Sequence, residues 1–446
     1  MSGVPKFIKK TLLPRYSRLG RLLRRLRDAL LDKPRGRPFG EAELLARTEE
    51  FNRSAEAYWQ VVDADPAARA NALDKPFTTV QDASSILYRL GMVLGELRLG
   101  PGQTVLDLGA GACWLSASLN RLGCRTISMD VSPTALKLGR ETFRLDPRQR
   151  PELDPQFLVY DGHRLPLPDE SVDRVVCFDA FHHFPNPDEI LAEIFRVLRT
   201  GGRAVFAEPG KGHFHTGQAR FETRRFHVLE NELDLRHLAA AASRLGFSEF
   251  LVKPYPDAVA ISLSAEEYFR LMDGADRFFP IDGLRRSLRD FHVFILAKGR
   301  EVFDSRNPGV LRAEITISRS SRVIRGAPGA SVGLPLTVRN AGDTLWRHEE
   351  SQAGGYVRLG GHLLSESGEP ADWDFFRAPL PCPVPAGRTI SFEARFRLPD
   401  RAGRHLLRLD LVDEGVTWFE QHGSPTTEVE LLVEGRAFGS PLARSF

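Results

Sequence analysis

The feature that most constrains the fold is an apolar segment that leads straight into a loop of small residues and then into a helical pattern. Residues 104–108 (TVLDL) predict a buried strand, residues 109–113 (GAGAC) a loop, and residues 114–121 a helix. Glycine lets the backbone approach a ligand closely and adopt dihedral angles that other residues avoid. We expect the amide groups at the start of the helix to face that ligand. The segment therefore predicts a ligand-binding loop at the carboxyl end of a strand.

A second apolar strand, at residues 125–130, ends in Asp130. A carboxylate about 20 residues after a glycine-rich loop can accept hydrogen bonds from both hydroxyls of a ribose. The loop lacks the G-x-G-x-x-G spacing that the pyrophosphate of a dinucleotide prefers. Asp107, just before the glycines, would repel phosphates but could hold a positively charged amino group. These residues favour a nucleoside ligand other than a dinucleotide.

The chain divides into two kinds of region. Helical patterns at residues 41–62 and 82–97 are followed, up to about residue 300, by short apolar runs that alternate with helices, which predicts a parallel sheet. Beyond about residue 310, apolar and polar residues alternate between turn formers, as in residues 390–398, which predicts an antiparallel β-sandwich. The expected organisation is a basic leader (1–40), an N-terminal helical region (41–100), an α/β domain (101–300), a linker (301–311), a β-sandwich (312–435) and a tail (436–446).

The leader carries 12 Lys and Arg residues against two acids, Asp28 and Asp32. Its leucines recur at three- and four-residue steps between residues 19 and 30, which predicts an amphipathic helix that lies on an anionic membrane surface. The alternative is a solvated helix that packs its leucine stripe on the rest of the chain. No recognition motif accompanies the basic stretch, which argues against nucleic-acid binding.

Composition excludes other classes of protein. At 446 residues, with 42% hydrophobic and 27% charged residues, the chain has the size of two to four folded units and an ordinary globular composition. No stretch approaches the roughly 18 consecutive apolar residues of a membrane-spanning helix, and we see no secretory signal. The four cysteines lie far apart, which argues against disulfides and structural zinc. We expect a cytoplasmic protein, with peripheral contact to the inner membrane face through the leader.

Residues 105–111 resemble the first motif of the class I S-adenosylmethionine-dependent methyltransferases, and the later motifs of that family follow in order. Residues 160–163 resemble the strand-end acid that meets the adenine amino group, residues 165–176 the approach to the fourth strand, residues 178–184 the segment that lines the sulfonium, and residues 198–206 the turn into the fifth strand. The resemblance covers about residues 80–300 and is closest to the small-molecule branch of the family. One departure is Cys113, where many members have a third glycine.

The resemblance implies a Rossmann-like α/β fold: a seven-stranded sheet with helices on both faces and an antiparallel final strand. It implies S-adenosylmethionine as the cofactor. The residues that it places at the cofactor are Asp107, Gly109, Ala110, Gly111, Asp130, Val131, Asp161, Gly162, Phe178 and Asp179.

A hydroxyl acceptor would need a general base, and the candidates are His182, His183, His213 and Glu208. For His182 and His183 the adjacent positions favour structural hydrogen bonding over a role as base or substrate contact. We expect no metal ion, because adjacent side chains on a loop diverge and no Asp, Glu or Cys cluster completes a ligand set. The excursion at residues 208–230, with ionisable residues from Glu208 to Glu230, predicts either a substrate-covering loop or a solvated connection. Residues 257–290 predict an insertion near the substrate.

The C-terminal region also carries a resemblance. Residues 340–346, 357–360 and 410–419 resemble immunoglobulin-like modules of bacterial enzymes and transporters that handle surface polysaccharides. Four aromatic residues could stack on sugars or could form core: Trp346, Trp373, Trp418 and Phe419.

The leading hypothesis is methyl transfer to a sugar, glycolipid or nascent polysaccharide at the cytoplasmic face of the membrane. One alternative is a methyltransferase for a quinone-like or other small metabolite. The other is a non-catalytic cofactor-binding adapter that recruits glycan or protein partners.

Overall fold

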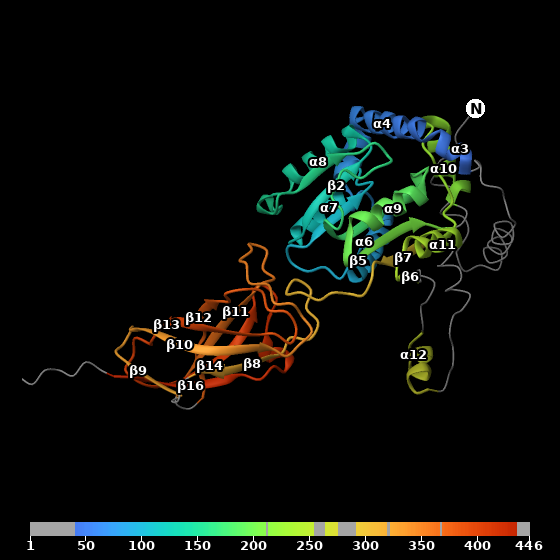
Figure 1. The fold of residues 1–446 in the computed structure, drawn as a ribbon. Coiled ribbons are helices and arrows are strands. Elements are labelled where there is room, and N and C mark those ends of the chain that lie inside the picture. Colours follow the sequence, from blue (N-terminus) through green and yellow to red (C-terminus); the bar gives the residue numbers. More distant parts are fainter. Residues whose placement is uncertain are drawn as a thin grey trace, which may run out of the picture.

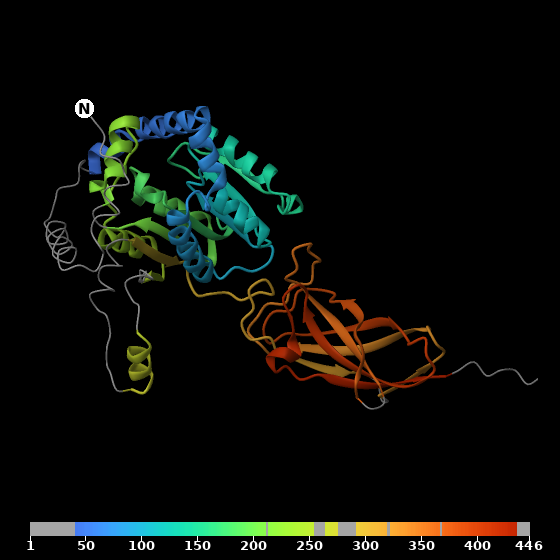
Figure 2. The ribbon, with the colours of Figure 1, turned by 180° about the vertical axis from the view of Figure 1, so that it is seen from behind.

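The computed structural model describes residues 41–210, 213–253, 264–274, 291–318, 322–365 and 368–434. The predicted leader and tail lie outside these ranges, as does most of the predicted insertion at residues 257–290. An α/β body is followed along the chain by a β-sandwich, seen from opposite sides in Figures 1 and 2.

The body is built on a seven-stranded sheet in the order β3-β2-β1-β4-β5-β7-β6. The strands are β1 (Thr104–Leu108), β2 (Arg125–Asp130), β3 (Gln156–Val159), β4 (Val172–Phe178), β5 (Leu198–Pro209), β6 (Glu249–Lys253) and β7 (Phe291–Ala297). The first five strands are parallel, whereas β7 pairs antiparallel with both β5 and β6. The predicted Rossmann-like sheet, with its antiparallel final strand, is confirmed.

Helices cover both faces of this sheet. The helices that precede the C-terminal region are α3 (Glu41–Ala46), α4 (Thr48–Ala64), α5 (Pro66–Asp74), α6 (Val80–Leu97), α7 (Trp114–Arg121), α8 (Pro133–Leu145), α9 (Pro187–Val197), α10 (Gly217–Phe226), α11 (Leu235–Leu245) and α12 (Ala265–Met272). Short 3-10 helices follow at η1 (Pro151–Leu153), η2 (Phe181–His183), η3 (His213–His215) and η4 (Phe419–His422). Successive side chains of a strand point to opposite faces. Leu106 and Leu108 therefore pack with α9 and α11, while Val105 packs with α6 and α7.

The N-terminal helices start at local capping signals. Asp65 Oδ1 accepts hydrogen bonds from the amides of Ala67 (2.9 Å) and Ala68 (3.0 Å), which starts α5 beside the break after α4. The Thr79 hydroxyl accepts a hydrogen bond from the amide of Asp82 (3.1 Å) and starts α6. α4 contacts α8 and α10 and lies across one edge of the body (Figure 1). This placement brings α4 over the carboxyl ends of the parallel strands.

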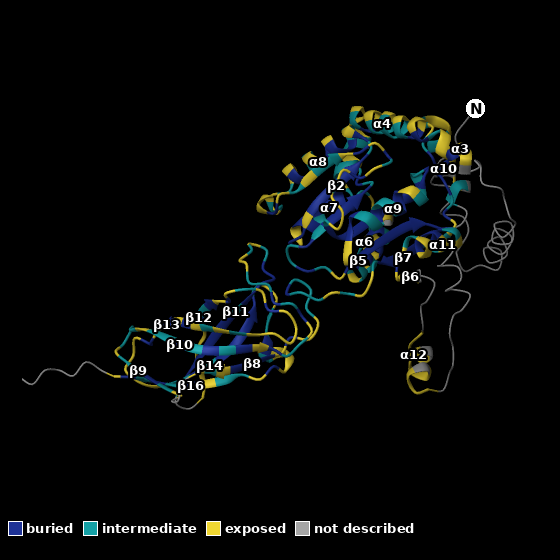
Figure 3. Cartoon of the chain, in the orientation of Figure 1, coloured by how far each residue is buried: buried dark blue, intermediate teal, exposed yellow. Residues whose placement is uncertain are grey.

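The C-terminal region forms two packed sheets, which confirms the predicted β-sandwich. One sheet has the order β13-β10-β8 and the other β12-β11-β14-β16-β9, with β15 paired to β14. Pairing is antiparallel except that β9 joins β16 in parallel among the described strands. The strands are β8 (Ala313–Ile317), β9 (Val323–Gly326), β10 (Ser331–Asn340), β11 (Val357–Leu364), β12 (Pro370–Pro379), β13 (Thr389–Arg397), β14 (Gly403–Asp413), β15 (Thr417–Trp418) and β16 (Thr427–Val433). The core between the sheets buries Leu334, Leu336 and Phe396. Figure 3 shows that β11 is buried over most of its length.

The segment between the two bodies is held to the sheet by an ion-pair network. Arg306 Nη1 and Nη2 lie 3.0 and 3.1 Å from the two carboxylate oxygens of Asp173. Arg199 Nη1 lies 3.0 Å from the same carboxylate, and the amide of Thr104 donates to it at 2.8 Å. Burial raises the pKa of Asp173, but the charge of Arg306 and these hydrogen bonds outweigh burial and hold the pKa below its usual value.

Among the residues that the structure describes, none of the helices combines the length and the apolar character that crossing a lipid bilayer requires.

Candidate active site

A cavity of about 960 Å³ lies at the carboxyl ends of the parallel strands. Its lining includes Gly109 after β1, Asp130 at the end of β2, Asp179 after β4 and Pro209 at the end of β5. Ligands of open α/β sheets bind at this edge. Aromatic side chains form much of the remaining wall: Phe51, Tyr58, Trp59, Tyr160, Phe184 and Phe291.

Gly109 and Gly111 of the glycine loop line the cavity. Their backbone conformation and close neighbours both require glycine. Gly109 and Gly111 have φ angles of 74° and 53°, in the left-handed region that favours glycine. A Cβ atom on Gly109 would lie 2.6 Å from the Cβ of Ala180, and one on Gly111 would lie 2.9 Å from Cζ2 of Trp59. The two glycines therefore allow Ala180 and Trp59 to pack against the loop more closely than any other residue would permit.

The amides of the glycine loop are hydrogen-bonded within the protein. The amides of Gly109 and Ala110 both donate to the carbonyl oxygen of Met129, at 2.8 and 3.0 Å. The amide of Gly111 donates to Asp130 Oδ2 at 2.9 Å. The loop folds back on β2, and the adjacent strand takes up these hydrogen-bond donors. At the start of the helix, where the sequence predicts amides that face the ligand, the amide of Ser116 donates to Asp107 Oδ2 at 3.0 Å. The loop offers shape to a ligand, and Asp130 offers the polar group.

Asp130 is 7% exposed and lines the cavity. Its Oδ1 accepts a hydrogen bond from the amide of Ser132 at 2.9 Å. Burial raises the pKa of this carboxyl, although the amides of Ser132 and Gly111 oppose the shift. Backbone amides donate to both oxygens, and a carboxylate has about four acceptor positions, so Asp130 can also accept a hydrogen bond from a ligand. Val131 and Gly162, also predicted at the cofactor, line the same cavity.

Four of the other residues predicted at the cofactor lie outside this lining: Asp107, Ala110, Asp161 and Phe178. Asp107 is buried behind the loop, where its Oδ2 accepts hydrogen bonds from the amide (3.0 Å) and hydroxyl (2.6 Å) of Ser116. Asp161 is exposed, and its Oδ1 accepts from the amides of His163 and Arg164, both at 2.8 Å. Asp107 and Asp161 therefore hold the loops around the cavity in this structure.

Two basic residues in the lining were missed by the sequence analysis. Arg89 pairs with Asp179 through both guanidinium nitrogens, one of them 2.9 Å from Oδ2, and its guanidinium lies over the rings of Phe178 and Phe291. Lys75 lines the cavity beside this pair, and burial lowers the pKa of its amine. Both come from the N-terminal helical region, far in sequence from the strand-end motifs. No local pattern distinguishes them from the other basic residues of that region.

Glu208 fixes the orientation of His182 in another part of the wall. Glu208 is completely buried at the end of β5, where it accepts hydrogen bonds from the amides of Ala180 (3.2 Å) and Phe181 (2.9 Å). Its Oε2 lies 2.7 Å from His182 Nδ1. Burial lowers the pKa of His182, but the hydrogen bond and charge of Glu208 outweigh burial and raise it above its usual value. Glu208 itself lies behind the lining, so it acts through His182.

Glu230 connects the other two predicted histidines. Its Oε2 lies 2.8 Å from His213 Nε2 and 3.8 Å from His182 Nε2, and its Oε1 lies 3.6 Å from His183 Nδ1. His183 Nδ1 also lies 2.5 Å from the carbonyl oxygen of Leu229, and burial lowers the pKa of His183 to about 4. The three predicted histidines line the cavity together with Glu230. The sequence analysis placed Glu230 in the same excursion as His213 but did not name it as a site residue, because a helix separates the two residues.

Part of the chain is similar in sequence to known methyltransferases. Residues 106–206 match the model of the methyltransferase domain family. The demethylmenaquinone methyltransferase of Renibacterium salmoninarum is 33% identical over 143 residues, which are 31% of this chain and 56% of that protein. The mitochondrial ubiquinone biosynthesis O-methyltransferase of Schizosaccharomyces pombe is 27% identical over 159 residues, 36% of this chain and 53% of that protein. The chain thus spans about half the length of these two relatives.

A longer match is an uncharacterized 37.1 kDa protein in transposon TN4556 of Streptomyces fradiae, 30% identical over 279 residues, or 59% of this chain and 77% of that protein. Among solved structures, the S-adenosylmethionine-dependent methyltransferase of Mesorhizobium loti aligns with a TM-score of 0.34 and 17% identity, covering 47% of this chain and 95% of that one. The match to the methyltransferase domain family thus covers residues 106–206, the part of the chain that carries the glycine loop, Asp130 and Asp179.

Proposed function

We propose that this chain transfers the methyl group of S-adenosylmethionine to a small organic acceptor, such as a quinone-like metabolite, inside the cavity. The observation that carries the proposal is that one cavity joins the glycine loop and Asp130 to the histidines and Glu230. Its volume of about 960 Å³ is near the upper end of the roughly 300–1,000 Å³ of small-molecule sites. Such a volume suits a cofactor together with a small acceptor, and the relatives named for quinone methylation support this acceptor class.

The residues present fit the cofactor. When bound, S-adenosylmethionine supplies an activated methyl group. Gly109 and Gly111 provide the space for a close approach of the nucleoside, and Asp130 provides acceptors for ribose hydroxyls. Lys75 offers a cation for the carboxylate of the amino acid moiety. The aromatic wall excludes water and orients the acceptor, and orientation alone can supply about 7–11 kcal/mol of a reaction barrier.

The histidines provide a place for the proton of an acceptor hydroxyl. His183 Nδ1 donates to the carbonyl oxygen of Leu229, so Nε2 keeps its lone pair. This nitrogen belongs to a side chain of the cavity wall and can accept a proton from a bound hydroxyl. Glu208 would act as a positioning residue for His182, with no direct part in proton transfer.

Methylation of a glycan is the second candidate, and one observation favours it. Trp373 is 41% exposed on the sandwich and stacks at 4.0 Å on His362, whose ring also lies 4.1 Å from that of Trp418. An exposed stack of this kind is a possible platform for a sugar. Trp346 and Phe419 are completely buried in the sandwich core, which leaves them no free face.

The test begins with the cofactor. We expect isothermal titration calorimetry of the full chain to detect binding of S-adenosylmethionine. Asp130→Ala should weaken that binding by about 1–3 kcal/mol, or roughly 5- to 150-fold, through lost hydrogen bonds to the ribose. Asp146→Ala is the matched control, because Asp146 pairs with Arg148 and lies outside the cavity. Equal affinities of wild type and Asp130→Ala would refute the proposed role of Asp130.

The second stage identifies the acceptor. The full chain is incubated with isotopically labelled S-adenosylmethionine and separate lipid, small-metabolite and saccharide fractions of a cell extract, and products are analysed by mass spectrometry. Label on a small aromatic metabolite supports the proposal, whereas label on saccharide material supports the glycan candidate. Cofactor binding without label transfer to any fraction would favour the non-catalytic adapter.

A further inference from the structure

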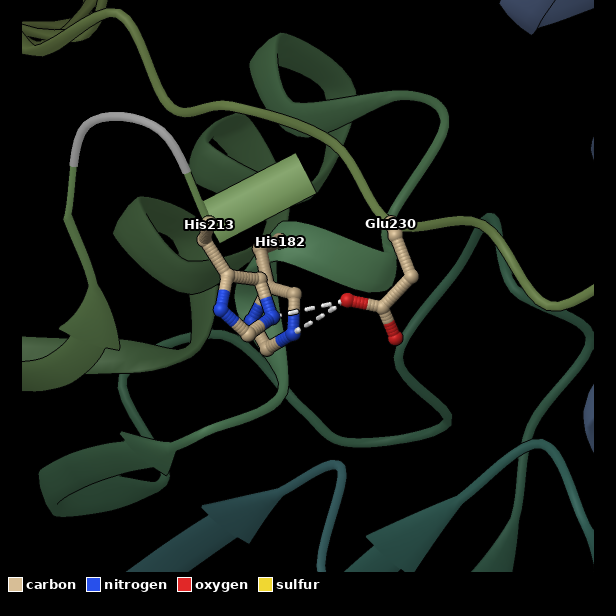
Figure 4. A group of neighbouring side chains, drawn as sticks. All are labelled: His182, His213 and Glu230. Atoms are coloured by element: carbon tan, nitrogen blue, oxygen red, sulfur yellow. Dashed lines mark hydrogen bonds and ion pairs between the residues drawn. The ribbon is translucent and has the colours of Figure 1, made fainter. Parts of the chain in front are cut away.

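Three side chains converge on one point in the cavity wall: His182, His213 and Glu230 (Figure 4). Glu230 Oε2 lies 2.8 Å from His213 Nε2 and 3.8 Å from His182 Nε2. The three ligand-type atoms all lie within 4.8 Å of one another. The residues come from η2, η3 and the segment before α11, so the fold, and not a local turn, brings them together.

The imidazole of His182 presents a free lone pair to this point. Its Nδ1 lies 2.7 Å from the Glu208 carboxylate, which already accepts amide hydrogen bonds and therefore acts as the acceptor. His182 Nε2 is too far from Glu230, at 3.8 Å, for a hydrogen bond. A histidine that donates one ring nitrogen to a carboxylate and directs the other into a cavity has the usual arrangement of a metal ligand with its supporting carboxylate.

The spacing also fits a metal ion. Zinc binds histidine nitrogen and carboxylate oxygen at about 2.0–2.2 Å, so two ligands of a tetrahedral ion lie roughly 3.3 Å apart. The observed separations of 2.8 and 3.8 Å from Glu230 Oε2 lie on either side of that value. Small side-chain shifts would place the three atoms at bonding distance from one ion.

The local charge favours a cation. Glu208 and Glu230 are both buried, and within the described ranges their ion-pair partners are histidines. Two buried carboxylates without a lysine or arginine partner are costly unless further positive charge compensates them. A divalent ion at the convergence point would provide that charge without displacing either carboxylate.

We propose that His182, His213 and Glu230 bind one divalent transition-metal ion, that Glu208 orients His182 for this purpose, and that the open coordination position faces the cavity. Two histidines and one glutamate with an open position form a donor set that suits zinc or iron(II). An oxygen atom of the methyl acceptor would occupy the open position. That last role rests on the proposed function, whereas the metal binding does not.

The test uses the full chain, stripped with a chelator and titrated with Zn²⁺ under calorimetry, with metal content measured by inductively coupled plasma mass spectrometry. We expect one zinc ion per chain at the cavity site and a spectrum typical of tetrahedral coordination when Co²⁺ replaces it. His213→Ala and Glu230→Gln should each weaken zinc binding at least 100-fold. Glu208→Gln should weaken it about 10- to 100-fold, as expected for a carboxylate that supports a ligand.

Two further variants serve as controls. His237→Ala removes a histidine that pairs with Asp188 at 2.8 Å outside the cavity, and it should leave zinc affinity unchanged. His362→Ala tests the sandwich, where His362, Asp410 and Glu420 also lie close enough to hold an ion. Zinc binding that persists in His213→Ala and Glu230→Gln, or that disappears only in His362→Ala, would overturn the inference.

Folding and cofactor binding are measured in parallel. Circular dichroism of His213→Ala is expected to match that of wild type, because this half-buried side chain lies on the cavity wall and not in the core. A variant that binds S-adenosylmethionine with wild-type affinity but loses zinc supports the metal site. A wild-type chain that binds the cofactor but takes up no metal overturns the inference and leaves the proposed function standing. A chain that binds zinc but not S-adenosylmethionine supports the metal site and overturns the proposed function.

Discussion

The α/β body and the β-sandwich both bury acidic side chains, but they surround them differently. In the body, Asp173 accepts hydrogen bonds from Arg306, Arg199 and a backbone amide, and Glu208 accepts from amides and His182. In the sandwich, both carboxylate oxygens of Asp413 are buried without a hydrogen-bond partner among the described residues.

Because of this difference, Asp173 and Asp413 have opposite protonation states at neutral pH. The charge of Arg306 and hydrogen bonds keep the pKa of Asp173 below its usual value, so it stays ionised at neutral pH. Burial raises the pKa of Asp413 to about 8, so this group is held largely as the neutral acid. Asp173 is thus a charged anchor between the sheet and the segment that carries Arg306, while Asp413 makes the sandwich sensitive to rising pH.

The largest effect is expected where a charged anchor loses its partner. Arg89→Met removes the cation that pairs with Asp179 and leaves that carboxylate in a largely buried site. We expect the free energy of unfolding to fall by about 3 kcal/mol, at the low end for breaking a buried pair, because Asp179 keeps some solvent contact and Lys75 lies nearby. Chemical denaturation followed by circular dichroism measures the loss.

The control for this prediction is the double variant Arg89→Met with Asp179→Asn, which removes both charges. Asn tolerates the left-handed backbone of position 179, where φ is 51°. The double variant should recover at least half of the lost stability. If Arg89→Met is as stable as wild type, the Asp179 carboxylate does not need the charge of Arg89. The buried acids of the body and of the sandwich would then not differ in their dependence on partners.

Much of the fold followed from the sequence because its signals are local. The strand, glycine loop and helix at residues 104–121 form one continuous pattern, and Asp130 ends the next strand. The alternation in the C-terminal region predicted the sandwich for the same reason, since a half-buried strand has a period of two. The hydrogen bonds of the loop amides to Met129 and Asp130 could not be predicted, because they depend on how the loop packs on β2.

The remainder of the site depends on contacts between distant segments. Lys75 and Arg89 precede the sheet, and Glu230 follows a loop and a helix, yet the fold brings them to the cavity beside the strand-end residues. Burial decides their chemistry, and burial is a property of the packed molecule. The same holds for Asp413, the last residue of β14. Nothing in the sequence around it indicates that its carboxylate lacks a hydrogen-bond partner among the described residues.

In the sandwich, removing a buried charge is expected to stabilise the chain. The folded pKa of Asp413 is raised from about 4 to about 8, so its contribution to stability is present at acid pH and is lost as pH rises through that window. Asp304 and Glu414 add to the shift, and Arg347 opposes it. Asp413→Asn should therefore stabilise the chain by about 1–2 kcal/mol at pH 8 and have little effect near pH 5.

Thermal unfolding at several pH values checks this prediction, and Asp400→Asn, an exposed aspartate in a turn of the same domain, is the control. The gap between wild type and Asp413→Asn should widen steadily from pH 5 to pH 8. A destabilised variant at pH 8 would show that the Asp413 carboxylate has a partner, and the contrast between the two bodies would then disappear.

The smallest effect is expected at Asp107, which combines features of both bodies. Its carboxylate has donors, the amide and hydroxyl of Ser116, yet burial still raises its pKa to about 6. The raised pKa means that its contribution to stability is lost as pH rises from about 4 to about 6, while the Ser116 hydrogen bonds oppose that loss. Asp107→Asn should thus change stability by less than about 1 kcal/mol at pH 7.

Ser116→Ala removes one donor, so it should steepen the loss of stability over the same pH range in denaturant titrations. An unchanged pH dependence in Ser116→Ala would mean that burial alone sets the state of this acid, as it does for Asp413, and that donors do not distinguish the body from the sandwich.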